Sequence, residues 1–178
     1  KYISVDVAGF GKDLAIIKVW EGWGVVKIKI YKKSSPEELL AGIEEERKAF
    51  NIPKYRVVYD HDWMGWGLAG KDYIAFKGGD PCLEYNWVKD NYKNLKTQCY
   101  YRIIENVINE DLMWITETEI YVDWVKAIKR ANIDKEWKRQ TNTKEEQKVI
   151  LWRSPDFWDT IMMRFIFALS KKKTLLII

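Results

Sequence analysis

Tyr2-Ile3-Ser4-Val5-Asp6-Val7-Ala8 opens the chain with an alternation of apolar and polar residues that is typical of a β-strand. Glycine-containing turns at 9–11 and 22–24 follow, and they separate two further strand-like runs over residues 13–20 and 26–30. Three consecutive strands joined by short turns predict an antiparallel meander.

A helix and a strand come next. Ser34-Ser35-Pro36-Glu37-Glu38 combines a capping serine, an early proline and two acids, and it predicts a helix that ends near residue 50. Residues 55–60 predict a central strand, because Val57 and Val58 in succession indicate burial on both faces. We expect a fifth strand at 73–76 and a long loop over 77–90.

The second half of the chain is mostly helical in pattern. Helices are expected at 94–109, 119–131 and 154–169, with an extended piece at 113–115, a strand or loop at 137–141 and a helical turn at 143–147. This order predicts an α/β fold with a mixed central sheet that is flanked by helices. The sheet should consist of an antiparallel three-strand meander plus parallel strands. The ribonuclease H-like fold has the same order. We expect one domain over residues 1–170 and a frayed basic and apolar tail over 171–178.

Composition excludes several classes of protein. With 47% hydrophobic and 31% charged residues the chain is an ordinary globular sequence, and no apolar run approaches the roughly 18 residues of a membrane span. Two cysteines and one histidine are too few for a nitrogen and sulfur metal site, so oxygen must hold any metal. The chain starts at Lys1 in strand-like sequence, and we interpret it as a piece of a longer protein.

Three aspartates occupy positions where a charged residue is unusual: Asp6 lies inside an apolar strand, Asp60 at the end of a central strand, and Asp159 beside the apolar stripe of the last helix. Taken singly, each has an ordinary explanation: Asp6 as a strand-edge residue that faces water, Asp60 as a turn former, and Asp159 as a partner of the helix dipole. Taken together, acids that converge in a partly buried site repel one another unless a cation offsets their charge. Mg²⁺ and Mn²⁺ are the cations that such carboxylate ligands select, and a pair of these ions can catalyse the hydrolysis of a phosphodiester.

Four segments also carry a resemblance to a known family. They are Val5-Asp6-Val7-Ala8-Gly9 with Lys12-Asp13, Val58-Tyr59-Asp60-His61-Asp62 with Gly65 and Gly67, Asn94-Leu95-Lys96-Thr97-Gln98-Cys99-Tyr100, and Arg153-Ser154-Pro155-Asp156-Phe157-Trp158-Asp159 with Met162-Met163-Arg164. In this order, over roughly residues 3–168, they resemble the C-terminal nuclease domain of tailed-bacteriophage large terminase subunits.

The resemblance implies a ribonuclease H-like, metal-dependent endonuclease that cuts concatemeric double-stranded viral DNA during packaging. By motif match the three acids of the family fall on Asp6, Asp60 and Asp159 as catalytic metal ligands, with two Mg²⁺ or Mn²⁺ ions. The implied partners are DNA, an N-terminal ATPase domain of the full-length chain, the portal and the small terminase subunit, with no membrane. The implied location is the host-cell cytoplasm, at the procapsid portal.

Three neighbouring aspartates are further candidate ligands. Asp62 either joins the metal site or holds the turn before Gly65, and Asp13 reaches the site only if the turn at 9–11 folds back. Asp156 lies in a first helical turn, where the helix dipole alone accounts for an acid.

Residues 121–178 carry 13 lysines and arginines against 7 acids, which suggests that one face meets a polyanion. The candidate phosphate contacts are Lys126, Lys129, Arg130, Lys135, Lys138, Arg139 and Arg153. The helical spacing of the first three of these residues is equally typical of a solvated helix face.

Two other functions remain open from the residues alone. A junction resolvase or transposase-like nuclease would keep the fold and the acids but prefer branched DNA. A non-catalytic nucleic-acid-binding or assembly module would gain no stability from Mn²⁺, since a ligand stabilises a protein only by binding its native state.

Overall fold

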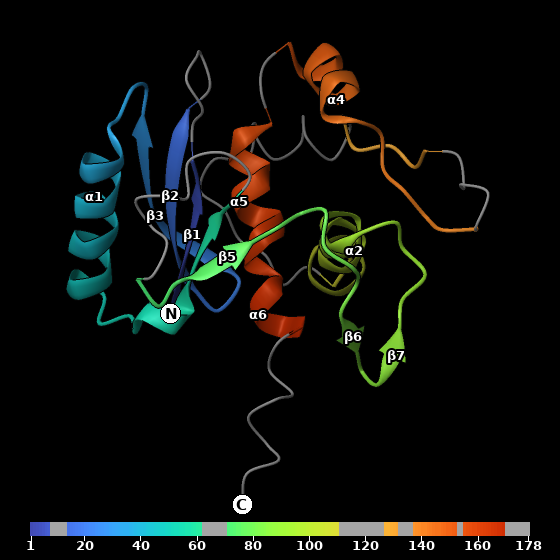
Figure 1. The fold of residues 1–178 in the computed structure, drawn as a ribbon, viewed down its shortest axis with the longest axis horizontal. Helices are drawn as coiled ribbons and strands as arrows, with labels where there is room; N and C mark the ends of the chain where they lie inside the picture. The colour runs from blue at the N-terminus through green and yellow to red at the C-terminus, as the bar shows by residue number, and fades with distance from the viewer. Residues whose placement is uncertain (8–13, 62–70, 111–126, 132–136, 153–154, 170–178) are drawn as a thin grey trace, which may run out of the picture.

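The computed structural model describes residues 1–7, 14–61, 71–110, 127–131, 137–152 and 155–169. Its centre is a five-stranded sheet with the strand order β3-β2-β1-β4-β5 (Figure 1). The strands are β1 (Tyr2–Asp6), β2 (Ala15–Glu21), β3 (Gly24–Tyr31), β4 (Val57–Asp60) and β5 (Ile74–Phe76). β1, β2 and β3 pair antiparallel, whereas β4 pairs parallel with β1, and β5 parallel with β4. The predicted meander with added parallel strands is therefore confirmed.

Helices cover both faces of this sheet. They are α1 (Pro36–Ala49), the 3-10 turn η1 (Lys54–Arg56), α2 (Leu95–Ile103), the π-helical turn η2 (Ile104–Ile108), α4 (Lys144–Leu151), α5 (Asp156–Arg164) and α6 (Ile166–Leu169). The start of α1 is fixed by a capping box in which Ser35 and Glu38 satisfy each other's backbone N–H groups, as the sequence predicts. None of the helices in these ranges is long and apolar enough to cross a membrane.

The two faces of the sheet have separate apolar cores. Ile3 and Val5 of β1 and Val57 and Tyr59 of β4 pack with α1 on one face. On the other face Val58 packs with side chains of α2, α5 and α6, and Figure 1 shows α5 running along this side of the sheet. Because successive strand residues point to opposite faces, the residues between the α1-facing ones must point toward α5.

Residues 77–90 differ from expectation, because a hairpin of β6 (Glu84–Tyr85) and β7 (Val88–Lys89) interrupts the predicted loop. Its two turn residues, Asn86 and Trp87, have φ of 51° and 64°. Such a turn is normally signalled by Asn-Gly, and the tryptophan in place of glycine hides it in the sequence.

Three helix boundaries also differ. The expected helix 154–169 divides at Phe165 into α5 and α6, and the expected turn at 143–147 extends to Leu151. Residues 128–131 are not helical as predicted, because they bond to the segment around Asn142 instead: Asn142 accepts a hydrogen bond from Lys129 N and donates to Ala127 O, and Arg130 forms an antiparallel bridge with Thr141. The expected elements at 113–115 and 119–126 and the tail at 171–178 lie outside the described residues.

Candidate active site

Asp6 and Asp60 come from adjacent parallel strands. The register of β1 and β4 pairs Ile3 with Val57, Ser4 with Val58 and Val5 with Tyr59. Asp6 and Asp60 are the next residues along each strand, so they end the two strands side by side. Since Val5 and Tyr59 face α1, both aspartates face α5 on the opposite side of the sheet. The structure therefore brings these two acids together at one edge of the sheet.

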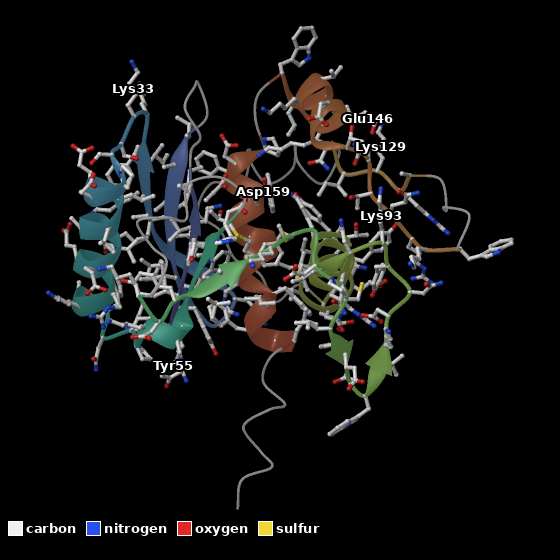
Figure 2. The ribbon with its side chains drawn as sticks, viewed as in Figure 1. Lys33, Tyr55, Lys93, Lys129, Glu146 and Asp159 are labelled. Atoms are coloured by element: carbon white, nitrogen blue, oxygen red, sulfur yellow. The ribbon has the colours of Figure 1, made fainter. Side chains whose placement is uncertain are left out.

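Asp159 reaches the same place from α5, which packs across β1, β2 and β4. Figure 2 shows it on α5 beside the sheet, and its side chain is fully buried. Asp156, one turn earlier, is also buried and accepts a hydrogen bond at 3.1 Å from Leu14 N to its Oδ2. Asp156 is thus a buried member of the acid cluster, and it lies in the first turn of α5 as the sequence predicts.

Two lysines and a tyrosine surround Asp159. Lys96 Nζ lies 3.0 Å from Asp159 Oδ1, and Tyr100 Oη donates a hydrogen bond to the same oxygen at 2.8 Å. Lys144 Nζ, from the first residue of α4, lies 3.3 Å from Asp159 Oδ2 and 4.0 Å from Asp156 Oδ1. Sequence reasoning did not assign a role to any of the three residues. The only indication in the sequence was that Lys96 and Tyr100 fall in segment 94–100, one of the four segments that resemble terminase nuclease domains.

The pKa values of the acids follow from these contacts. Burial raises the pKa of Asp6 well above its ordinary value, and the negative charges of Asp159, Asp156 and Asp60 raise it further against the opposing effect of Lys144. Burial alone would raise the pKa of Asp159 too, but Lys96, Lys144 and the hydrogen bond from Tyr100 hold it below its ordinary value. The cluster therefore combines one carboxylate that resists ionisation with one that is held ionised.

The carboxylates of this cluster are of the type that binds a divalent cation, and two lysines lie among them. Four carboxylates share the cluster with two ammonium groups, so negative charge is in excess when all four are ionised. Asp159 Oδ2 is buried and has no hydrogen-bond partner among the described residues, although Lys144 lies nearby. No three Asp, Glu, His or Cys side chains in that part of the chain are placed to hold one metal ion together. The residue types fit Mg²⁺ or Mn²⁺, while the structure shows Asp159 held by lysines.

The assignment of Asp6, Asp60 and Asp159 as metal ligands stays a prediction, as does that of Asp156. Asp13 and Asp62 lie outside the described residues.

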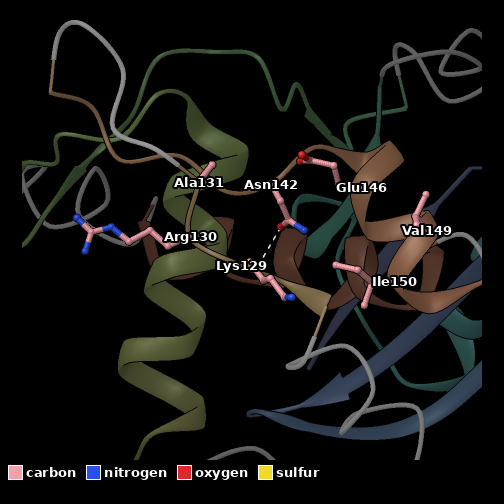
Figure 3. Close-up of a pocket in the computed structure, with 7 residues that line it drawn as sticks. All are labelled: Lys129, Arg130, Ala131, Asn142, Glu146, Val149 and Ile150. Carbon is pink, nitrogen blue, oxygen red and sulfur yellow. Dashed lines mark hydrogen bonds between the residues drawn. The ribbon is translucent and has the colours of Figure 1, made fainter.

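Part of the predicted basic surface lines a hollow. Lys129 and Arg130 border a cavity of about 550 Å³ together with Ala131, Asn142 and three residues of α4, namely Glu146, Val149 and Ile150 (Figure 3). Figure 3 shows the Arg130 side chain extending away from those of α4. Arg139 lies 4.0 Å from Glu105 and over the ring of Tyr92. Lys138 is described, whereas Lys126, Lys135 and Arg153 are not, and DNA contact by this set remains a prediction.

Comparison with known proteins identifies the fold. No family model matches the chain, and no curated protein matches it. The nuclease domain of the large terminase subunit gp2 of bacterial virus Sf6 superposes with a TM-score of 0.71 at 20% identity, covering 92% of this chain and 86% of that one. A lysine-to-alanine variant of that domain with manganese gives 0.65 at 18% identity over the same shares. The large terminase nuclease from thermophilic phage G20c gives 0.57 at 11% identity, covering 93% and 80%.

These likenesses confirm, at the level of the fold, the resemblance to phage large terminase nuclease domains. The protein is an α/β domain of the ribonuclease H-like class, with a mixed sheet between helices.

Proposed function

We propose that the protein is a metal-dependent DNA endonuclease that cuts concatemeric double-stranded viral DNA during genome packaging. The observation that carries this proposal is the convergence of Asp6 and Asp60, from the ends of adjacent parallel strands, with buried Asp159 on the helix that covers them. Its support from outside the chain is the shared fold of two phage terminase nucleases, one of them solved with manganese.

In this proposal Asp6, Asp60 and Asp159 hold two Mg²⁺ or Mn²⁺ ions. The chemistry that such an ion pair supplies is activation of a water molecule and stabilisation of the leaving oxygen of a phosphodiester. The remaining groups belong to the chain itself: Tyr100 orients Asp159 by its hydrogen bond, and Lys96 and Lys144 place positive charge where a phosphate must approach.

The proposal also places the protein in an assembly. Its partners would be double-stranded DNA, an ATPase domain of the same full-length chain, the portal and the small terminase subunit, in the host-cell cytoplasm at the procapsid. The cavity beside Lys129 and Arg130 offers basic groups for DNA phosphates close to α4, whose first residue reaches the acid cluster.

Nicking of supercoiled plasmid in Mn²⁺ tests the proposal. Asp60→Asn and Asp159→Asn should each abolish nicking while circular dichroism shows an unchanged fold. Asp72→Asn is the matched control, because its side chain is 81% exposed and its carboxylate lies 3.7 Å from Lys54 Nζ. Full activity in either site variant would refute the assignment. A preference for branched over linear duplex DNA would favour a junction resolvase.

A further inference from the structure

Lys96 is held in position by the backbone next to it. It is the second residue of α2, and its N–H donates to Gly78 O at 3.0 Å. A Cβ atom at Gly78 would lie 3.2 Å from Lys96 Cβ and 3.4 Å from Lys96 Cδ. The lysine stem therefore lies directly against this glycine, which leaves its ammonium group directed at Asp159.

The location is unfavourable for a cation in two respects. The first turn of a helix carries the positive end of the helix dipole, where acids are stabilising and lysines are not. The side chain is only 30% exposed, so its charge has lost much of its water. The ion pair with Asp159 Oδ1 at 3.0 Å offsets both costs, and Lys96 in turn offsets the burial of Asp159.

A metal ion and Lys96 compete for the same carboxylate. A carboxylate oxygen binds Mg²⁺ at about 2.0–2.1 Å, and a divalent cation at that distance would repel an ammonium group 3.0 Å from the same oxygen. The structure shows the state in which Lys96 holds that oxygen, with Tyr100 as its second partner.

We propose that Lys96 is the counter-cation of Asp159 in the metal-free protein and must release Oδ1 when a divalent cation binds, so that this lysine limits metal affinity. The inference rests on the proposed function, because it takes Asp159 to be a metal ligand. It assigns Lys96 as a positioning residue whose role is visible without any cleavage.

Replacing Lys96 by methionine tests this, since the stem is kept and the charge removed. Mn²⁺ binding should be measured by isothermal titration calorimetry, and the Mn²⁺-induced rise in Tm by thermal denaturation. Lys96→Met should lower the Kd for Mn²⁺ at least fivefold and enlarge the rise in Tm, although the metal-free Tm falls. Lys54→Met is the matched control, because Lys54 pairs with exposed Asp72 at 3.7 Å, and it should leave both quantities unchanged.

Gly78→Ala serves as a second variant should Lys96→Met fail to fold. The added methyl group displaces the lysine stem by a few tenths of an ångström while keeping the charge, so the Kd for Mn²⁺ should fall by a smaller factor.

An unchanged or weaker Mn²⁺ affinity in a folded Lys96 variant would overturn the inference and leave Lys96 as a purely structural partner. If the wild-type protein itself neither bound Mn²⁺ nor nicked DNA, the proposed function would fail as well. Comparing the wild-type protein with the variant therefore separates the two failures.

Discussion

Asp6→Asn should make the metal-free protein more stable while removing the proposed metal-dependent nicking. Asp6 is 4% exposed, and three other carboxylates lie near it, one on β4 and two on α5. Its charge is thus opposed by burial and by like charges, while the positive charge of Lys144 favours it. Asparagine has nearly the same shape and no charge, so it removes the repulsion and keeps the packing.

The sign follows from the raised pKa of Asp6. A carboxyl whose pKa is higher in the folded than in the unfolded state binds its proton more tightly when folded. Its contribution favours folding at low pH and is lost as pH rises through the folded-state pKa. Each pKa unit by which folding raises the pKa of Asp6 favours its protonated form by about 1.4 kcal/mol, so replacing the carboxylate by an amide should raise the free energy of unfolding at pH 7.5. For a chain of this size each kcal/mol gained raises Tm by roughly 2–4 °C.

Thermal denaturation in EDTA at pH 7.5 measures this gain directly. The gain should shrink as the pH is lowered, because the wild-type Asp6 then takes up its proton and comes to resemble the amide. Asp72→Asn controls for the loss of one negative charge, since Asp72 is exposed and asparagine tolerates its φ of 63°. A variant that is less stable than the wild type at pH 7.5, or a gain independent of pH, would refute the view that Asp6 is held under repulsion.

Three further predictions concern stability. Arg164→Lys should lower the free energy of unfolding by about 1–3 kcal/mol, measured in urea, because the buried guanidinium lies within 5.6 Å of three aromatic ring centroids and lysine lacks its planar face. Thr143→Ala should cost about 1 kcal/mol by removing the capping box with Glu146; an unchanged Tm would show that α4 does not depend on this cap. Arg47 lowers the pKa of Glu44 to about 2, so its stabilisation should be lost as pH falls from about 4.5 to about 2. Glu44→Gln should flatten that part of the acid denaturation curve, and a wild-type curve would contradict the pairing.

The sheet could be predicted because short stretches of sequence determine its strands and the direction of their side chains. The alternation in residues 2–8 sets which β1 side chains face α1, and the successive valines at 57 and 58 mark β4 as central. Once the two strands are adjacent and parallel, the positions of Asp6 and Asp60 follow from counting. Two of the three proposed catalytic acids were thus placed by strand periodicity together with the order of the elements.

The hairpin and the lysines were not predictable, because neither leaves a local pattern. Trp87 adopts a left-handed conformation that sequence rules reserve for glycine or asparagine, so the turn was invisible. Lys96 looks like an ordinary solvated helix residue until α2 is packed beside α5 and brings it to Asp159. Its role depends on a contact between residues 63 positions apart, which no periodicity along the chain encodes.

The two lysines change how the acid cluster must be understood. Carboxylates gathered at strand ends are costly in a protein without metal, and a fold that must persist before metal binds needs some internal cation. Here α2 and α4 each contribute one lysine, one to each oxygen of Asp159, so the most deeply buried acid of the cluster has two close cations. Among the described residues no lysine pairs with Asp6 at such a distance, and Asp6 is the acid of the cluster whose pKa is raised. It follows that a divalent ion should relieve Asp6 and displace lysines from Asp159, so substitutions at these two acids should change metal-free stability in opposite directions.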